Sequence, residues 1–85
     1  MTATNIDEVI QVAMLFRGED IRPAAFVWNG RRYDVTRILL AHKTRHGDVL
    51  RWHFNVETSG NGQAELLFDT LSLSWRLNSL TEGGV

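Results

Sequence analysis

Hydrophobic and polar residues alternate along most of this chain, in short stretches that are separated by turn residues. The clearest stretch covers residues 50–57, and its apolar positions are Leu50, Trp52, Phe54 and Val56. Because successive side chains of a strand point to opposite faces, these four side chains share one face. The pattern predicts a half-buried antiparallel β-strand.

A second alternating region, residues 24–35, contains the dipeptide Asn29-Gly30 at its centre. Asn-Gly between two such runs predicts a β-hairpin with a two-residue type I′ turn, because both turn residues need a positive φ. The turn predicts three cross-strand pairs: Trp28 with Arg31, Phe26 with Tyr33, and Ala24 with Val35. We expect a cation–π contact between Arg31 and Trp28 at the rim of the sheet.

The remaining segments continue the all-β pattern. The second hairpin strand is expected to continue over residues 36–40, and residues 42–48 are expected to form a polar, basic loop. Further strands are predicted at residues 64–68 and 73–77, the last with Leu73, Trp75 and Leu77 facing inward. Between them, Asp69 is expected to begin a turn by accepting hydrogen bonds from nearby backbone N–H groups.

Residues 5–16 fit two patterns. Their apolar residues alternate as in a strand, whereas Asn5 and Glu8 resemble a helix-capping box and some apolar positions also fit helical spacing. The β-branched residues of the segment favour the strand. We therefore predict an all-β fold, a small five- or six-stranded bent antiparallel meander sheet or open barrel. The alternative is an α+β fold with an N-terminal helix at about residues 5–16.

The length and composition indicate one globular domain over residues 1–85, with an ordered core at about 9–79 and a flexible tail at 80–85. A flat sheet of this size would leave a second apolar face bare, so curling, a helix or dimerisation must cover it. That face would carry Val27, Ile38, Leu40, Leu66 and Phe68.

No cysteine is present, which excludes disulfides and thiolate metal sites and suits a reducing cytoplasm. The first residues lack the features of a secretory signal, and apolar runs such as residues 12–16 are too short to cross a membrane. We therefore expect a cytoplasmic protein that does not act at a membrane.

The charge is unevenly distributed although the net charge is only −1. Residues 22–53 hold seven Arg or Lys against two Asp, and the flanking segments hold two basic residues against eight acidic ones. A basic surface with an exposed aromatic ring can bind phosphates and stack bases. The candidate nucleic-acid or anion-binding residues are Trp28, Arg31, Arg32, Lys43, Arg45 and Arg51.

No pattern indicates catalysis, a metal or a cofactor. His42 and His46 are spaced four apart and His53 follows, but the charges of Lys43 and Arg45 would repel a cation. The carboxylates show no spacing that brings two of them into one cleft, and neither a nucleophile-elbow motif nor a phosphate-binding loop is present. We expect no catalytic residues, no metal ligands and no enzyme activity.

Several of these positions together resemble a small bacterial domain family of unknown function. The hairpin matches its F-x-W-x-G-R-x-Y-x-V motif at residues 26–35, and the resemblance covers about residues 10–79. The later matching positions are Trp52, Glu65, Leu66, Asp69, Trp75 and Leu77. The resemblance implies a small antiparallel β domain and assigns no catalytic residue. This chain departs from the family in its longer N-terminal stretch and in having Leu67-Phe68 where charged residues are common.

Two function classes follow. The preferred interpretation is a non-enzymatic binding module that contacts a protein partner or a second copy of itself, because an apolar second face or an edge strand needs no special charge to do so. The alternative is an accessory domain that binds nucleic acid or another anion through its basic central surface.

Overall fold

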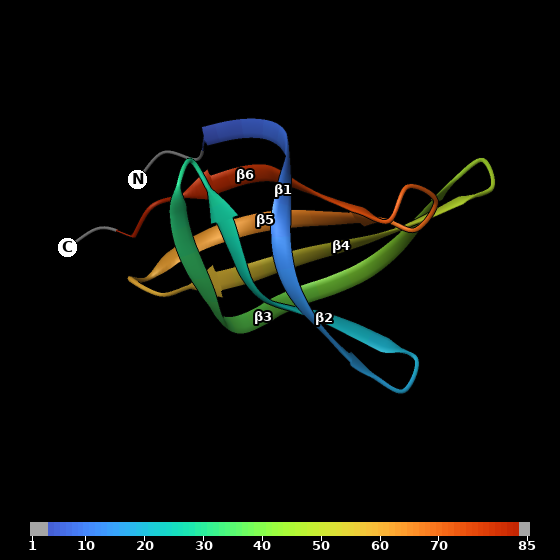
Figure 1. Cartoon of the computed structure of the whole chain (residues 1–85), viewed down its shortest axis with the longest axis horizontal. Coiled ribbons are helices and arrows are strands. Elements are labelled where there is room, and N and C mark those ends of the chain that lie inside the picture. Colours follow the sequence, from blue (N-terminus) through green and yellow to red (C-terminus); the bar gives the residue numbers. More distant parts are fainter. Residues whose placement is uncertain (1–3, 84–85) are drawn as a thin grey trace.

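The computed structural model describes residues 4–83, which form six antiparallel strands closed into a barrel (Figure 1). The strands follow one another around the barrel in chain order, and the first pairs with the last. The expected all-β meander is therefore confirmed, and pairing of β1 with β6 closes it. The strands are β1 (Thr4–Arg17), β2 (Asp20–Trp28), β3 (Arg31–His46), β4 (Val49–Thr58), β5 (Gly62–Asp69) and β6 (Ser74–Thr81).

The first strand closes the barrel by changing its partner midway. Residues 4–10 of β1 pair with β6, and residues 11–17 pair with β2. Irregularities between Asn5 and Glu8 and between Ala13 and Met14 interrupt the two ladders, and breaks of this kind bend a strand. The strand interpretation of residues 5–16 is thus confirmed, and the alternative helix there is wrong.

The Asn29-Gly30 hairpin has the predicted turn and register. Asn29 and Gly30 both have positive φ, 54° and 75°, and Phe26 stacks on Tyr33 with ring centroids 5.0 Å apart. The ladder ends at Ala25 and Asp34, so the expected pair of Ala24 with Val35 is absent from it. Val35 pairs on its other side with Thr58 of β4, so β3 stays on β4 where it parts from β2.

The prediction of a loop at residues 42–48 is wrong, because residues 42–46 continue β3. A two-residue turn at Gly47-Asp48, with φ 63° at Gly47, joins β3 directly to β4. The prediction that Leu73 faces inward from the last strand is also wrong. Leu73 precedes β6, has φ 57° and is 74% exposed.

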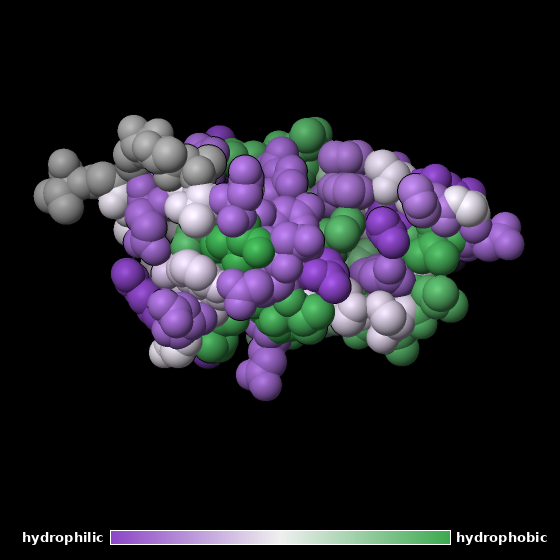
Figure 2. All heavy atoms as spheres, turned by 90° about the horizontal axis from the view of Figure 1, so that it is seen from above, coloured by the Kyte–Doolittle hydropathy of each residue, from purple (hydrophilic) through white to green (hydrophobic). Residues whose placement is uncertain are grey.

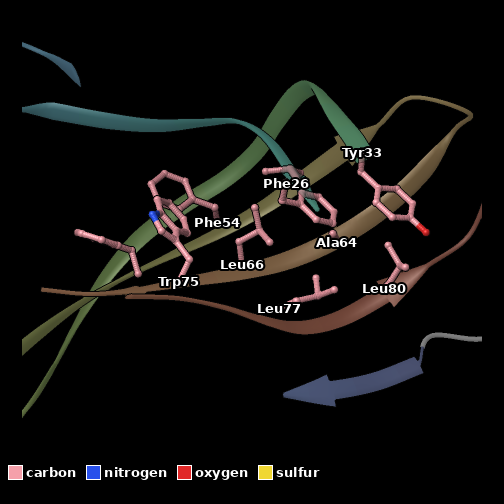
Figure 3. Packing of buried hydrophobic residues seen from close by; sticks show 10 residues of the cluster. Phe26, Tyr33, Phe54, Ala64, Leu66, Trp75, Leu77 and Leu80 are labelled. Carbon is pink, nitrogen blue, oxygen red and sulfur yellow. The ribbon is translucent and has the colours of Figure 1, made fainter. Parts of the chain in front are cut away.

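The core fills the barrel with buried side chains from β2 to β6 (Figure 3), and apolar residues of β1 such as Ile10 and Met14 pack against it. Phe54, Val56, Leu66 and Leu77 are at most 1% exposed, and Trp75 is buried as predicted. Trp52 is partly buried and packs against this core. The second apolar face is largely removed by closure of the sheet: Phe68 is buried and Ile38 partly buried, whereas Val27 and Leu40 stay exposed.

The strands extend beyond the ordered core expected at residues 9–79. Leu80 is 3% exposed and belongs to the core, and Glu82 accepts a hydrogen bond from the Tyr33 hydroxyl at 2.8 Å. Residues 80–82 therefore pack on the barrel, while residues 84–85 of the expected tail lie outside the described residues. Residues 4–83 contain no helix of the length and apolar character that crossing a membrane requires.

Candidate functional site

The barrel wall is weakest between β2 and β3. Their ladder has four residue pairs, from Ala25–Asp34 to Trp28–Arg31. Beyond Ala25 the strands separate, and the β1–β2 and β3–β4 hairpins project from one end of the molecule (Figure 1). Residues 20–24 of β2 and 36–46 of β3 consequently pair with a neighbour on one side only. We call this the open end and define it by Phe16, Ile21, Ile38 and Trp52.

Phe16 is the most exposed of the four residues that define the open end. The Trp75 indole N–H lies 3.4 Å from the Met14 sulfur, which places Met14 on the core side of β1. Phe16 follows two residues later on the same face, and its register partner Ile21 packs against the core. The ring of Phe16 is nevertheless 72% exposed, so the core-facing row of β1 continues past the end of the barrel into solvent.

A cleft of about 300 Å³ separates the two hairpins at the open end. Its lining includes Arg17, Ile21 and Arg22 from one hairpin and Ile38, Trp52 and Phe54 from the other. The indole of Trp52 stacks on Phe54 at 5.9 Å, and the Lys43 ammonium lies 4.4 Å from the centroid of the indole ring. One wall of the cleft is thus an aromatic ring that is partly covered by a cation.

Exposed apolar side chains also occur near the open end. Figure 2 shows hydrophobic surface at the end of the molecule from which the hairpins project. Leu15 on β1 is 57% exposed, and Leu71 and Leu73, in the loop between β5 and β6, are 77% and 74% exposed. Four of the eight exposed large apolar side chains of residues 4–83 therefore lie around the end of the barrel where the strand pairing is incomplete.

The structure separates the six residues that were predicted as a basic site. Trp28, Arg31 and Arg32 lie at the β2–β3 turn, whereas Lys43, Arg45 and Arg51 lie on the β3–β4 hairpin at the other end of the barrel (Figure 1). The six residues therefore do not form one continuous surface.

Trp28 and Arg31, at the β2–β3 turn, both contact nearby carboxylates. The indole N–H of Trp28 donates to Glu8 at 3.1 Å, so the ring turns towards β1. Arg31 lies over the ring of Tyr33 at 5.2 Å and pairs with Glu82 at 3.7 Å. The expected contact between Arg31 and Trp28 is therefore wrong. Burial and the hydrogen bond to Glu82 raise the pKa of Tyr33.

The second group is divided between the two faces of the sheet. Register irregularities between Val35 and Arg37 and between Ile38 and Leu40 each shift the side-chain alternation of β3 by one residue, so the second restores the alternation. Lys43 pairs with Trp52 and shares its face, as Arg45 does with Leu50, and both pairs are symmetric about the Gly47-Asp48 turn. Arg51 points to the opposite face.

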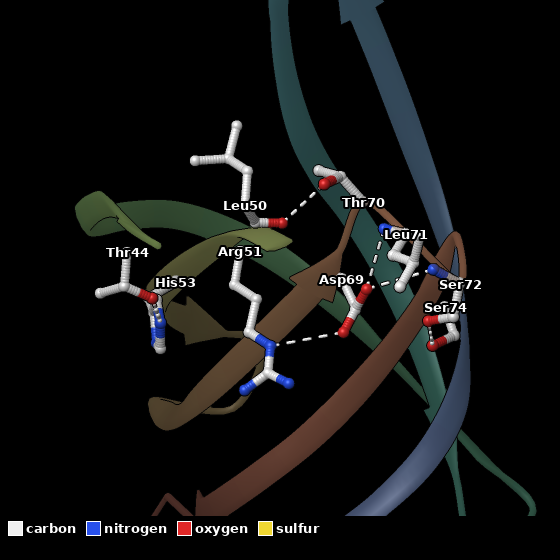
Figure 4. Close-up of polar contacts among 9 residues, drawn as sticks. All are labelled: Thr44, Leu50, Arg51, His53, Asp69, Thr70, Leu71, Ser72 and Ser74. Atoms are coloured by element: carbon white, nitrogen blue, oxygen red, sulfur yellow. Dashed lines mark hydrogen bonds and ion pairs between the residues drawn. The ribbon is translucent and has the colours of Figure 1, made fainter. Parts of the chain in front are cut away.

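On that opposite face, Arg51 forms an ion pair with Asp69 at 3.3 Å (Figure 4). Asp69 also accepts hydrogen bonds from the backbone N–H groups of Leu71 at 2.9 Å and Ser72 at 3.1 Å. The predicted turn role of Asp69 is thus confirmed. The bond from Ser72 is the main cause of a lowered pKa at Asp69, and the bond from Leu71 and the charge of Arg51 add to it.

A histidine pair lies on the same outer face. His42 and His53 are register partners, and their rings stack with centroids 4.6 Å apart. The Thr44 hydroxyl lies 2.7 Å from Nε2 of His53, and burial, with the charge of His42, lowers the pKa of His53. The part of the chain that the structure describes contains no group of three metal-ligating side chains. The symmetric spacing of both histidines about Gly47-Asp48 is a sequence signal that could have predicted this pair.

Four cations gather at the open end, and two of them were not predicted as site residues. Among residues 4–83, five of the basic side chains form ion pairs, with no carboxylate within 4.0 Å of the other four. Those four are Arg17, Arg22, Lys43 and Arg45. Glu19, Asp20 and Asp48 lie in or beside the turns of the same hairpins. Arg17 and Arg22 were missed because the sequence did not show that the two hairpins share one end of the barrel.

Comparison with known proteins gives one match. A family model described as "Domain of unknown function (DUF6504)" matches residues 1–82. No curated protein and no solved structure matches the chain.

Proposed function

The chain belongs to the DUF6504 family, whose function is unknown, and we propose that it is a non-enzymatic module that binds another protein through the open end of its barrel. The observation that carries this proposal is the exposure of Phe16, a core-facing aromatic side chain that the barrel leaves 72% exposed. Complete burial of a phenylalanine side chain is worth about 1.5–3 kcal/mol. A partner that covers the exposed 72% of Phe16 would gain the corresponding share of this free energy.

The surroundings of Phe16 also favour a protein partner. Leu15, Leu71 and Leu73 add exposed apolar surface at the same end, and concentrated apolar surface is typical of protein contact sites. Aromatic side chains are enriched in the parts of protein interfaces that bury the most surface. The absence of cysteine keeps the cytoplasm as the proposed compartment.

Nucleic acid is less well supported as the ligand. Five of the nine Arg and Lys side chains are paired with carboxylates, and the net charge is −1. The face of Trp52, the aromatic ring that lines the cleft, carries the Lys43 ammonium. A base that stacks there would have to displace this cation.

The test is affinity capture from a lysate of the source cells with the wild-type protein, Phe16→Ser and a matched control, Val9→Ser. Val9 lies on the same strand and is 61% exposed, but it pairs with Arg76 on the outer face. We expect a protein that wild type and Val9→Ser retain and Phe16→Ser loses. That protein, once identified and purified, should bind the wild type in a calorimetric titration and bind Phe16→Ser at least tenfold more weakly.

Three results would overturn the proposal. Equal retention of every protein by Phe16→Ser and Val9→Ser would show that the open end is not the contact surface. A wild-type dimer in sedimentation that Phe16→Ser converts to a monomer would make a second copy the occupant. Tight, salt-dependent binding of oligonucleotides would assign the open end to nucleic acid.

A further inference from the structure

We infer that the partner enters the open end as an extended, acidic segment that adds a β-strand to the free edge of β3. The inference rests on the proposed function and specifies how the partner binds. It combines three features of the open end, which are an unpaired strand edge, two cations beside that edge and an apolar surface further along it.

The free edge is residues 36–46 of β3. These residues pair with β4 on one side, whereas the ladder with β2 ends at Asp34. Within residues 4–83, no other backbone hydrogen bond reaches this edge. Every second residue therefore presents an N–H and a C=O that an extended segment can bind. The facing edge of β2 contains Pro23, which has no N–H to donate, so β3 is the better edge.

Two cations beside the free edge favour a negatively charged segment. Lys43 and Arg45 share the face of Trp52, and no carboxylate lies within 4.0 Å of either among the described residues. Carboxylates in cross-strand positions beside them would form favourable pairs. A second copy would bring its own Lys43 and Arg45 to this edge in an antiparallel pairing, and such like charges repel. The charges therefore favour a different, acidic chain over a second copy.

Apolar residues further along the free edge favour apolar side chains in the rest of the segment. Along β3, Ala41 and then Ile38 precede the cations on the same face, and both line the cleft with Ile21. An added strand that runs antiparallel to β3 has its N-terminus beside Arg45 and its C-terminus beside Ile38. From its N-terminus it should therefore carry two acidic residues, two positions apart, followed by apolar residues with the same spacing.

The probe for this inference is the synthetic peptide acetyl-Thr-Glu-Thr-Glu-Thr-Ile-Thr-Ile-Thr-amide with a fluorescent label, compared with the same peptide in which Lys replaces both Glu. Anisotropy titrations at low ionic strength should show about tenfold tighter binding of the Glu peptide by the wild type. The double variant Lys43→Glu/Arg45→Glu should prefer the Lys peptide. The control Arg32→Glu, at the other end of the barrel, should keep the wild-type preference.

A second measurement tests strand addition on the wild type itself. The peptide is N-methylated at its odd-numbered residues in one version and at its even-numbered residues in another. Only alternate N–H groups of an added strand bond to the edge, so one version should lose at least tenfold in affinity and the other should keep it. Equal affinities of both versions, equal affinities of the Glu and Lys peptides, or no binding at millimolar peptide would each overturn strand addition.

These outcomes separate the inference from the proposed function. Suppose that a purified partner binds through Phe16 but the peptides show neither the charge preference nor the N-methyl pattern. This result would keep the protein-binding function and reject the acidic strand. Equal capture by Phe16→Ser and Val9→Ser rejects the function itself.

Discussion

At the scale of single residues, the β2–β3 hairpin depends on the backbone of Gly30. Gly30 has φ 75°, and a β-branched side chain is strained in that conformation. We expect Gly30→Val to lower the free energy of unfolding by about 1–2 kcal/mol, measured by urea denaturation. The control Asn29→Gly should stay within about 0.5 kcal/mol of wild type, because glycine adopts positive φ freely. An unchanged Gly30→Val would contradict the turn.

The histidine stack predicts a dependence of stability on pH. Burial and the charge of His42 lower the pKa of His53, so the folded protein keeps this ring neutral while the unfolded chain binds a proton near pH 6.5. Below about pH 6.5 the unfolded state takes up more protons, and the free energy of unfolding falls until the lower folded pKa is passed. The melting temperature should therefore be lower at about pH 5.5 than at about pH 7.5.

The matched variant for this prediction is His53→Gln. It removes the titrating ring but keeps a side chain that can hydrogen-bond with the Thr44 hydroxyl. The decrease in melting temperature should be smaller in this variant. An equal decrease in both proteins would mean that His53 does not cause the pH dependence.

At the scale of elements, the projecting hairpins should be separable from the fold. Phe16 lies at the tip of the β1–β2 hairpin and is 72% exposed, whereas Phe54 is 1% exposed in the core. Phe16→Ser should change the free energy of unfolding by no more than about 0.5 kcal/mol, and Phe54→Ala should cost about 3–5 kcal/mol. Urea denaturation of both variants tests this. A large loss for Phe16→Ser would mean that the hairpin tip supports the core.

At the scale of the whole molecule, the balance of charges predicts weak or absent nucleic-acid binding. Fluorescent single- and double-stranded oligonucleotides, titrated at low salt with tens of micromolar protein, should not bind. If the four cations of the open end did hold single-strand phosphates, the slope of log affinity against log salt would be about −3. A slope of that size, reduced by about one unit in Lys43→Gln, would replace the protein-binding proposal.

The sequence alone was sufficient for the parts of the structure that depend on neighbouring residues. Alternation over residues 50–57 predicted the inward row of β4, Asn29-Gly30 predicted a hairpin and its register, and Asp69 was recognised as a turn residue. Each of these features is determined within a few residues, because strand periodicity and turn conformation are properties of the local backbone.

The tertiary structure alone decided how these pieces face one another. Separation of β2 from β3 beyond Asp34 opens one end of the molecule, and pairing of β1 with β6 closes the barrel and buries Phe68. Ion pairs with distant carboxylates remove Arg31 and Arg51 from the predicted basic surface. Barrel closure and ion pairs join residues far apart in the chain, so neighbouring residues in the sequence do not reveal them. The local pattern therefore determined the strands and most of the core, and the three-dimensional packing determined the open end.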